Sequence, residues 1–178
     1  MMNNWTVGEA KQWLRNRIEE GAKCPCCTQF AKVYDRKIHF NMAKALIIFY
    51  RHASMKGLDD YHNLNDVYAN EKESVSQLRG DFPKLKHWGL ITEQANEDAK
   101  KKASGCWKLT QIGIDFIENK MKVHSHVRIY NDRVLKTFGE YVDIRECLAE
   151  KYDYAELVSN RFEGMESDNP TNHQQELF

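Results

Sequence analysis

The chain lacks any long hydrophobic run. It has 178 residues, of which 42% are hydrophobic, and its mean hydropathy is −0.71. No segment approaches the roughly 18 consecutive apolar residues that a membrane helix needs, and the first residues lack the apolar region of a secretory leader. The five cysteines are odd in number and unevenly spaced, which does not fit a secreted disulfide framework. These absences predict a cytoplasmic protein with a real core and no membrane partner.

Recognisable catalytic motifs are also missing. The sequence has no glycine-rich phosphate loop, no nucleophile elbow and no His-Glu-x-x-His zinc site. Acidic clusters at Asp59–Asp60 and Glu71–Glu73 lie in or beside turns and have the character of solvated surface. We therefore expect a protein that is not an enzyme.

Net charge is zero, but the charges are not evenly spread. Residues 1–58 carry +6, residues 59–75 carry −4, residues 76–138 carry +5 and residues 139–178 carry −7. A basic body with an acidic tail is compatible with binding a polyanion through one face. Ordinary scatter over a solvated surface gives the same numbers, so charge alone leaves both interpretations open.

The pattern of residues 74–116 predicts a helix, a two-stranded wing and a further helix. Ser74 and Gln77 fit a capping box, and apolar residues follow at helical spacing at Val75, Leu78, Phe82 and Leu85. The helix ends on Gly89, a polar lysine-rich tip spans 96–104, and Thr110 can cap the last helix. Gly80 and Pro83 interrupt the helix over 74–88, so it is either kinked or divided in two, with Asp81 or Phe82 capping the second part.

Two short motifs in this segment carry a resemblance. Trp88-Gly89-Leu90-Ile91, followed by Trp107-x-Leu109-Thr110-x-x-Gly113-x-x-Phe116, resembles the winged helix-turn-helix superfamily of DNA-binding proteins. The resemblance covers about residues 41–120 and implies a winged-helix fold, which also serves as a protein–protein adaptor. The whole chain is similar to uncharacterised phage or prophage proteins.

The expected fold class is α+β, a winged helix-turn-helix core with appendages on both sides. Residues 1–40 hold a helix capped by Thr6 and Glu9 and ended by Gly21, then a Cys-x-x-Cys knuckle. A β-hairpin or an extended pair follows over 30–40, turning near Asp35. Residues 41–120 form the winged-helix domain, with Asn41 capping its first helix and a short second helix over 64–69. Residues 121–159 hold a hairpin turning at Asn131–Asp132 and two short helices, and residues 160–178 form a disordered acidic tail.

The cysteine knuckle is half of a zinc-ribbon motif. Cys24 and Cys27 are spaced to hold one ion, as in a structural zinc site, but no second Cys-x-x-Cys follows. The further ligand is left open among Cys26, His39, Cys106, Cys147, His124 and His126. Free cysteines in a small core, or a redox pair, are the alternatives.

Two basic surfaces are candidates for nucleic-acid binding. The first comprises residues of the third helix and the wing: Ser76, Gln77, Arg79, Lys84, Lys100, Lys101 and Lys102. Arg79 and Gln77 can make bidentate contacts with base edges, and the lysines suit phosphates. The second lies on the hairpin, where aromatic residues interleave with Lys120, Lys122, Arg128, Arg133 and Lys136. It could follow a backbone or stack on bases, or it could be an appendage packed on the winged domain.

The last five residues offer a different partner. Gln174, Leu177 and Phe178 resemble the short peptide by which bacterial replication proteins hold the sliding clamp. Two apolar anchors on a polar tail can occupy a preformed pocket. The sequence thus predicts a DNA-binding accessory factor in transcription regulation or replication of a phage or mobile element, or instead a non-catalytic adaptor that docks a replication protein through this tail.

Overall fold

The computed structural model describes residues 5–69, 75–97, 103–151 and 153–159. Helices and short antiparallel sheets share this part of the chain, so the predicted α+β class is confirmed. Within these ranges no helix is both long enough and apolar enough to cross a membrane.

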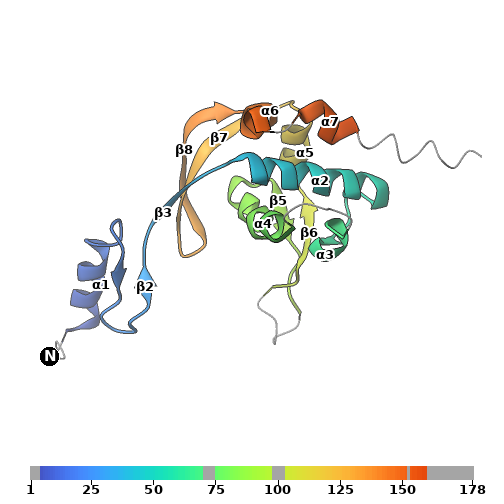
Figure 1. The fold of residues 1–178 in the computed structure, drawn as a ribbon. Helices are drawn as coiled ribbons and strands as arrows, with labels where there is room; N and C mark the ends of the chain where they lie inside the picture. The colour runs from blue at the N-terminus through green and yellow to red at the C-terminus, as the bar shows by residue number, and fades with distance from the viewer. Residues whose placement is uncertain (1–4, 70–74, 98–102, 152, 160–178) are drawn as a thin grey trace, which may run out of the picture.

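The N-terminal segment projects from the rest of the molecule (Figure 1). Helix α1 (Val7–Arg15) begins with the predicted capping box, in which Thr6 and Glu9 bond reciprocally to each other's backbone N–H. The expected end at Gly21 is wrong, because the helix is already closed at Asn16, whose N–H bonds to the carbonyl of Gln12. Strands β1 (Ala22–Lys23) and β2 (Phe30–Ala31) then pair around the cysteine turn.

The hairpin expected over residues 30–40 is also wrong. Strand β3 (Tyr34–Lys37) does not fold back on its neighbour but pairs with β7, nearly a hundred residues along the chain. Asp35 lies in the middle of β3 rather than in a turn, and its carboxylate accepts two hydrogen bonds from Arg128 at 2.7 and 3.0 Å. This charged cross-strand pair stabilises an extended backbone at Asp35. The local sequence does not reveal Arg128 as its partner.

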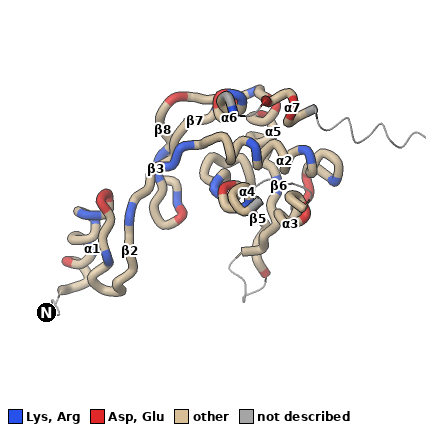
Figure 2. The backbone as a smooth tube through the Cα atoms, viewed as in Figure 1, with Lys and Arg blue, Asp and Glu red and all other residues tan. Residues whose placement is uncertain are grey.

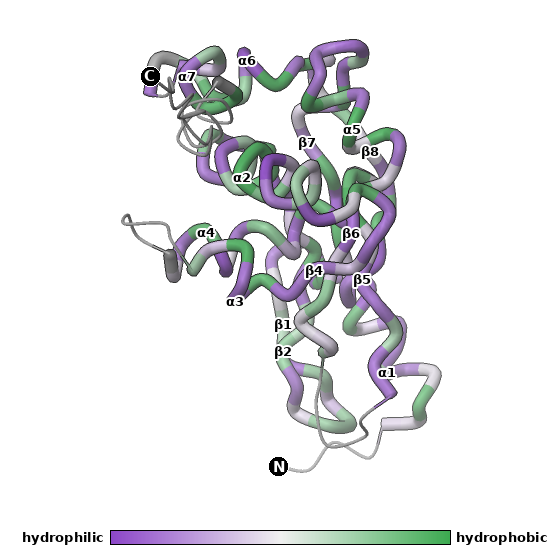
Figure 3. The backbone as a smooth tube through the Cα atoms, turned by 90° about the vertical axis from the view of Figure 1, so that its right-hand side faces the viewer, coloured by the Kyte–Doolittle hydropathy of each residue, from purple (hydrophilic) through white to green (hydrophobic). Residues whose placement is uncertain are grey.

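Helix α2 (Phe40–Lys56) forms the centre of the core. Its first residue is Phe40 and its cap position is His39, so the prediction that Asn41 caps it is wrong by two positions. The run from Met42 to Phe49 is buried on all sides, because other elements surround the helix. In Figure 3, α2 lies between α7 (Tyr154–Ser159) and α4 (Val75–Asp81), both of which it contacts.

A second group of elements packs on one side of α2. In chain order it comprises β4 (His62–Asn63), α3 (Leu64–Val67), α4, the 3-10 helix η1 (Phe82–Trp88), β5 (Ile91–Glu93) and β6 (Cys106–Leu109). The strands form an antiparallel sheet in the order β4-β6-β5. The expected third helix is two helices, α4 and η1, with Asp81 at the cap position and Pro83 in the first turn of η1. The divided alternative is therefore confirmed, while the proposed Ser74 cap lies outside the described residues.

Gly113 holds the following helix close to this sheet. Helix α5 (Gln111–Ile117) is capped by Thr110 as predicted, since its hydroxyl accepts from the N–H of Gly113 at 3.0 Å. A Cβ at Gly113 would lie 2.0 Å from the carbonyl oxygen of Leu90. Only a glycine lets the two backbones approach this closely.

The long hairpin is confirmed. Strands β7 (Val123–Tyr130) and β8 (Arg133–Val142) are joined by Asn131 and Asp132, both with positive φ, as a tight hairpin turn requires. Buried and half-exposed residues alternate along β7, so one face of the β3-β7-β8 sheet packs on the core. The indole nitrogen of Trp88 donates a hydrogen bond of 2.7 Å to the carbonyl of His124, which ties η1 to this sheet.

Two short helical segments follow the hairpin, as predicted. They are α6 (Ile144–Leu148) and α7, with the single 3-10 turn η2 (Ala149–Lys151) between them. Ile144 and Leu148 are fully buried against the core, and the Tyr154 hydroxyl donates to the carbonyl of Ile117 at 2.8 Å. The segment 160–178, expected to be a disordered tail, lies outside the described residues.

Candidate nucleic-acid interface

Helix α4 presents a polar face to solvent. Leu78 is buried against the core at 4% exposure, whereas Ser76, Gln77 and Arg79 are exposed. In the described part of the chain no acidic side chain lies within ion-pair distance of Arg79. Gly80 is also exposed, and a Cβ built on it meets no atom within 4 Å. The helix therefore combines hydrogen-bonding groups, one uncompensated cation and room for close approach.

The lysines of η1 are less available than the sequence suggests. Lys84 lies 2.7 Å from the carboxylate of Asp81, which His39 also approaches at 3.8 Å. Lys86 lies 2.6 Å from Asp132 in the β7–β8 turn. To bind a phosphate, either lysine would exchange an existing ion pair for a new one, so we expect each to add little to affinity.

Only part of the predicted wing lies within the described residues. Lys100, Lys101 and Lys102 fall outside the described residues. On strand β6 the ammonium of Lys108 lies 5.1 Å from the ring centroid of Tyr61, a half-exposed side chain on the loop before β4. This cation–π pair places one further positive charge on the same sheet as the wing.

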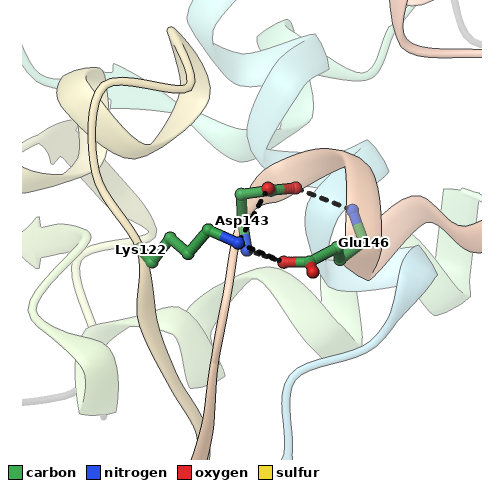
Figure 4. Close-up of polar contacts among 3 residues, drawn as sticks. All are labelled: Lys122, Asp143 and Glu146. Atoms are coloured by element: carbon green, nitrogen blue, oxygen red, sulfur yellow. Dashed lines mark hydrogen bonds and ion pairs between the residues drawn. The ribbon is translucent and has the colours of Figure 1, made fainter.

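The second basic surface is mostly neutralised. Lys120 forms an ion pair with Glu118, and Arg128 is bound by Asp35 and, at 3.4 Å, by Glu19. Lys122 reaches the capping box at the start of α6, 3.3 Å from Asp143 and 3.1 Å from Glu146 (Figure 4). Of the five predicted cations, only Arg133 and Lys136 have no ion-pair partner among the described residues. Three of the five cations are therefore held in ion pairs with the protein's own acids.

What remains of that surface is aromatic. On the outward face of β7 and β8, the His124 and Tyr141 rings lie 4.1 Å apart, and those of His126 and Phe138 lie 5.3 Å apart. Lys136 places its ammonium 5.4 Å from the Phe138 ring centroid. Tyr141 is 62% exposed. The two ring pairs and Lys136 form what we call the stacking face.

The cysteine turn has the local geometry expected of a knuckle. The N–H of Thr28 bonds to the Cys24 carbonyl, and the Cys24 N–H bonds to Gln29, which closes the turn between β1 and β2. Hydrogen bonds from the backbone of Cys27 and Cys26 hold the pKa of the Cys24 thiol below its usual range. Donors aimed at a sulfur stabilise its thiolate, the form that binds metals.

A cavity of about 460 Å³ opens beside this turn. Cys24 and Cys27 line it from one side, and His87, Asp132 and Arg36 line it from the β3-β7-β8 sheet and η1. His87 is a residue type that can bind zinc, and it lines the same cavity. Within the described ranges, however, no three His, Cys, Asp or Glu side chains gather closely enough to hold an ion. Structural zinc at Cys24 and Cys27 stays a prediction from their spacing.

Most of the other suggested ligands have different surroundings in the fold. The rings of His124 and His126 lie on one face, as predicted, but stack on Tyr141 and Phe138. Cys106 accepts a weak hydrogen bond from Asn63, Cys26 is exposed, and His39 precedes α2. Cys147 is buried in α6, and burial raises the pKa of its thiol to about 12. Cys26 belongs to the cysteine turn itself, but the structure does not bring His39, Cys106, Cys147, His124 or His126 to it.

Two features of the surface escape sequence reasoning. Spacing alone does not place Tyr141 on the same face as Phe138, because residues three apart point to opposite faces of a regular strand. It also gives no partner for Arg128. Gly139 was the available signal, since a glycine inside a strand often marks a bulge. The predicted partner motif at Gln174, Leu177 and Phe178 lies outside the described residues.

Comparison with protein-family models, with curated proteins and with solved structures finds no match for this chain. Any functional conclusion therefore rests on the side chains themselves.

Proposed function

We propose that residues 40–117 form a winged helix that binds duplex DNA through α4. The observation that supports this most is the polar face of α4, where Ser76, Gln77 and Arg79 are exposed while Leu78 is buried against the core. The order α2, β4, α3, α4, β5, β6, with β4 pairing to β6, is the order of helices and strands that a winged helix has. Such proteins usually place a helix of this kind in the major groove.

The chemistry of the face fits base reading better than general attraction. Arg can bond guanine and Gln can bond adenine with two hydrogen bonds each. Among the described residues Lys84 and Lys86 are held in ion pairs, so we expect these two lysines to add little electrostatic attraction. We therefore expect modest affinity for random DNA and a clear preference for one sequence.

The test is titration of labelled duplexes by fluorescence anisotropy, after selection of a preferred site from a random pool. Arg79→Ala should weaken binding to that site by about 1–3 kcal/mol while changing binding to random duplex little. Lys11→Ala is the matched control, because it removes one exposed charge from α1 on the projecting segment. Equal loss on all sequences after Arg79→Ala would rule out base reading.

Gly80→Glu provides a second, independent variant. Residue 80 is exposed and a Cβ there meets no atom within 4 Å, so the new side chain has room to point into solvent, where it places a negative charge on the proposed interface. We expect it to abolish duplex binding without unfolding the protein. Undiminished binding by this variant would mean that α4 does not face DNA.

A protein-binding adaptor is the alternative function. The observation that favours it is the neutralisation of Lys84, Lys86, Lys120, Lys122 and Arg128 by the protein's own acids. If no duplex binds at low salt, the scaffold would instead present a partner-binding surface, and removal of residues 174–178 would test the clamp-binding tail.

A further inference from the structure

The stacking face is assembled by two irregularities in β8. Between His124 and His126 the partner residue moves from Tyr141 to Phe138, so β8 contains one extra residue there. Between Arg128 and Ile129 it moves from Lys136 to Val134, a second extra residue. Each extra residue reverses the alternation of the strand. As a result, four residues of β8 all lie opposite outward-facing residues of β7, although two have odd numbers and two have even ones: Arg133, Lys136, Phe138 and Tyr141.

Gly139 makes the first irregularity possible. Its φ is +84°, and a Cβ there would lie 2.4 Å from the Ser125 hydroxyl and 2.8 Å from Nδ1 of His126. Its carbonyl oxygen lies 3.2 Å from Nδ1 of His124. The backbone of this one glycine therefore lies against the histidines of both ring pairs.

The opposite face of β7 packs on the core, whereas β8 is largely exposed on that side too, with Val134 at 42%. Val123, Val127 and Ile129 are buried at 7% exposure or less. The outward face has no such covering in the described part of the chain, and 62% of Tyr141 remains accessible. Its rings are therefore available to a partner from outside.

Charge distinguishes among possible partners. Lys136 sits beside the Phe138 ring, and Arg133 pairs with Tyr130 in the register of the hairpin. Asp35, the acid in direct contact with this surface, is already bound by Arg128. Lys and Arg also mark the region where β3 crosses the hairpin (Figure 2). The rings thus lie beside two cations that form no ion pair with the described residues, although the exposed Glu140 precedes Tyr141 in the chain. Rings next to such cations suit a ligand with flat bases and phosphates.

We propose that the stacking face binds single-stranded nucleic acid. Tyr141 with His124, and Phe138 with His126, stack on successive bases, and Lys136 and Arg133 contact the phosphates. A duplex cannot use this surface in the same way, because its bases are already stacked on each other. The site is separate from α4, so it stands or falls independently of the proposed duplex binding.

The experiment is anisotropy titration of the full chain with labelled oligothymidylate of about 15 nucleotides, a length that suits one binding surface. Tyr141→Ala and Phe138→Ala should each weaken binding by about 5- to 100-fold, and the loss should persist at higher salt because stacking is not electrostatic. Tyr141→Phe keeps the ring and should bind like the unmodified protein. A parallel titration with oligouridylate distinguishes RNA from DNA as the ligand.

Two controls separate this proposal from duplex binding and from misfolding. Tyr61→Ala removes another exposed tyrosine, 40% accessible, from the loop before β4 and should leave single-strand affinity unchanged. Arg79→Ala should affect duplex alone, and Tyr141→Ala should affect single strands alone. Failure of the unmodified protein to bind oligothymidylate or oligouridylate at low salt, or full binding by Tyr141→Ala, would overturn the proposal and leave the face to a protein partner.

Discussion

At the scale of single residues, two glycines that lie inside helices have opposite roles. Gly113 in α5 has no room for a Cβ, because the rigid backbone of Leu90 would lie 2.0 Å from it. Gly80 in α4 has no atom within 4 Å of the same position. The first glycine is required by packing, and the second only weakens its helix.

The two therefore form a matched pair for measurement. Gly113→Ala should destabilise the protein by about 1–3 kcal/mol, because α5 or the Leu90 backbone must move. Gly80→Ala should stabilise it by about 0.4–1 kcal/mol through reduced freedom of the unfolded chain. Chemical denaturation of both variants gives the values. Equal stability of the two would show that α5 does not pack on Leu90 as described.

At the scale of elements, the hairpin depends on Gly139 in the same way that α5 depends on Gly113. The residue adopts a positive φ, which costs an L side chain about 1–2 kcal/mol, and a Cβ would press on Ser125 and His126. Gly139→Ala should lower the free energy of unfolding by at least that amount. Asn131, which already has positive φ at the turn, gives the comparison: Asn131→Gly should be neutral or mildly stabilising.

The same substitution also bears on function. If β8 loses its irregularity, Tyr141 and Phe138 can no longer share a face, and single-strand binding should fall together with stability. Measurement of both quantities on Gly139→Ala, at a temperature where the variant is folded, separates the effects. A variant that keeps its full single-strand affinity would show that the irregularity does not position the rings.

At the scale of the whole molecule, stability should depend on pH through two histidines. The side chain of His87 is only 8% exposed, and burial lowers its pKa although Asp132 opposes the shift at 3.5 Å. Lys86 and Arg36 add to the lowering. Burial also lowers the pKa of His52, beside His62 and Lys56. Below the pKa of an unfolded histidine, about 6.5, the unfolded chain therefore binds more protons than the folded one.

The sign of the effect follows from this difference. Stability from these groups is fully present above about pH 6.5 and is lost as the pH falls toward their folded pKa values. Urea denaturation at about pH 7.5 and pH 5.5 should show a lower free energy of unfolding at the acid value. His87→Gln should reduce the difference between the two. A difference that His87→Gln leaves intact would assign the pH dependence to other groups.

Much of the secondary structure follows from local chemistry. Caps at Thr6 and Thr110, the turn at Asn131–Asp132, the break before Pro83 and the helix over Ile144–Leu148 are confirmed, because each depends on neighbours within a few residues. The predicted start of α2 and the predicted end of α1 are each wrong by a few residues, since helix ends depend on packing as well as on caps. The exposed positions of α4 also follow from its spacing.

Only the tertiary structure decided how distant segments pair and which charges remain free. Pairing of β3 with β7, the register shifts of β8 and the ion pairs of Lys122, Lys86 and Arg128 join residues far apart in sequence. A cation looks the same in a sequence whether or not an acid from another element reaches it. The sequence therefore determined which residues could bind a polyanion, and the fold decided which ones are available, because neutralisation and strand register are set by contacts that no local pattern encodes.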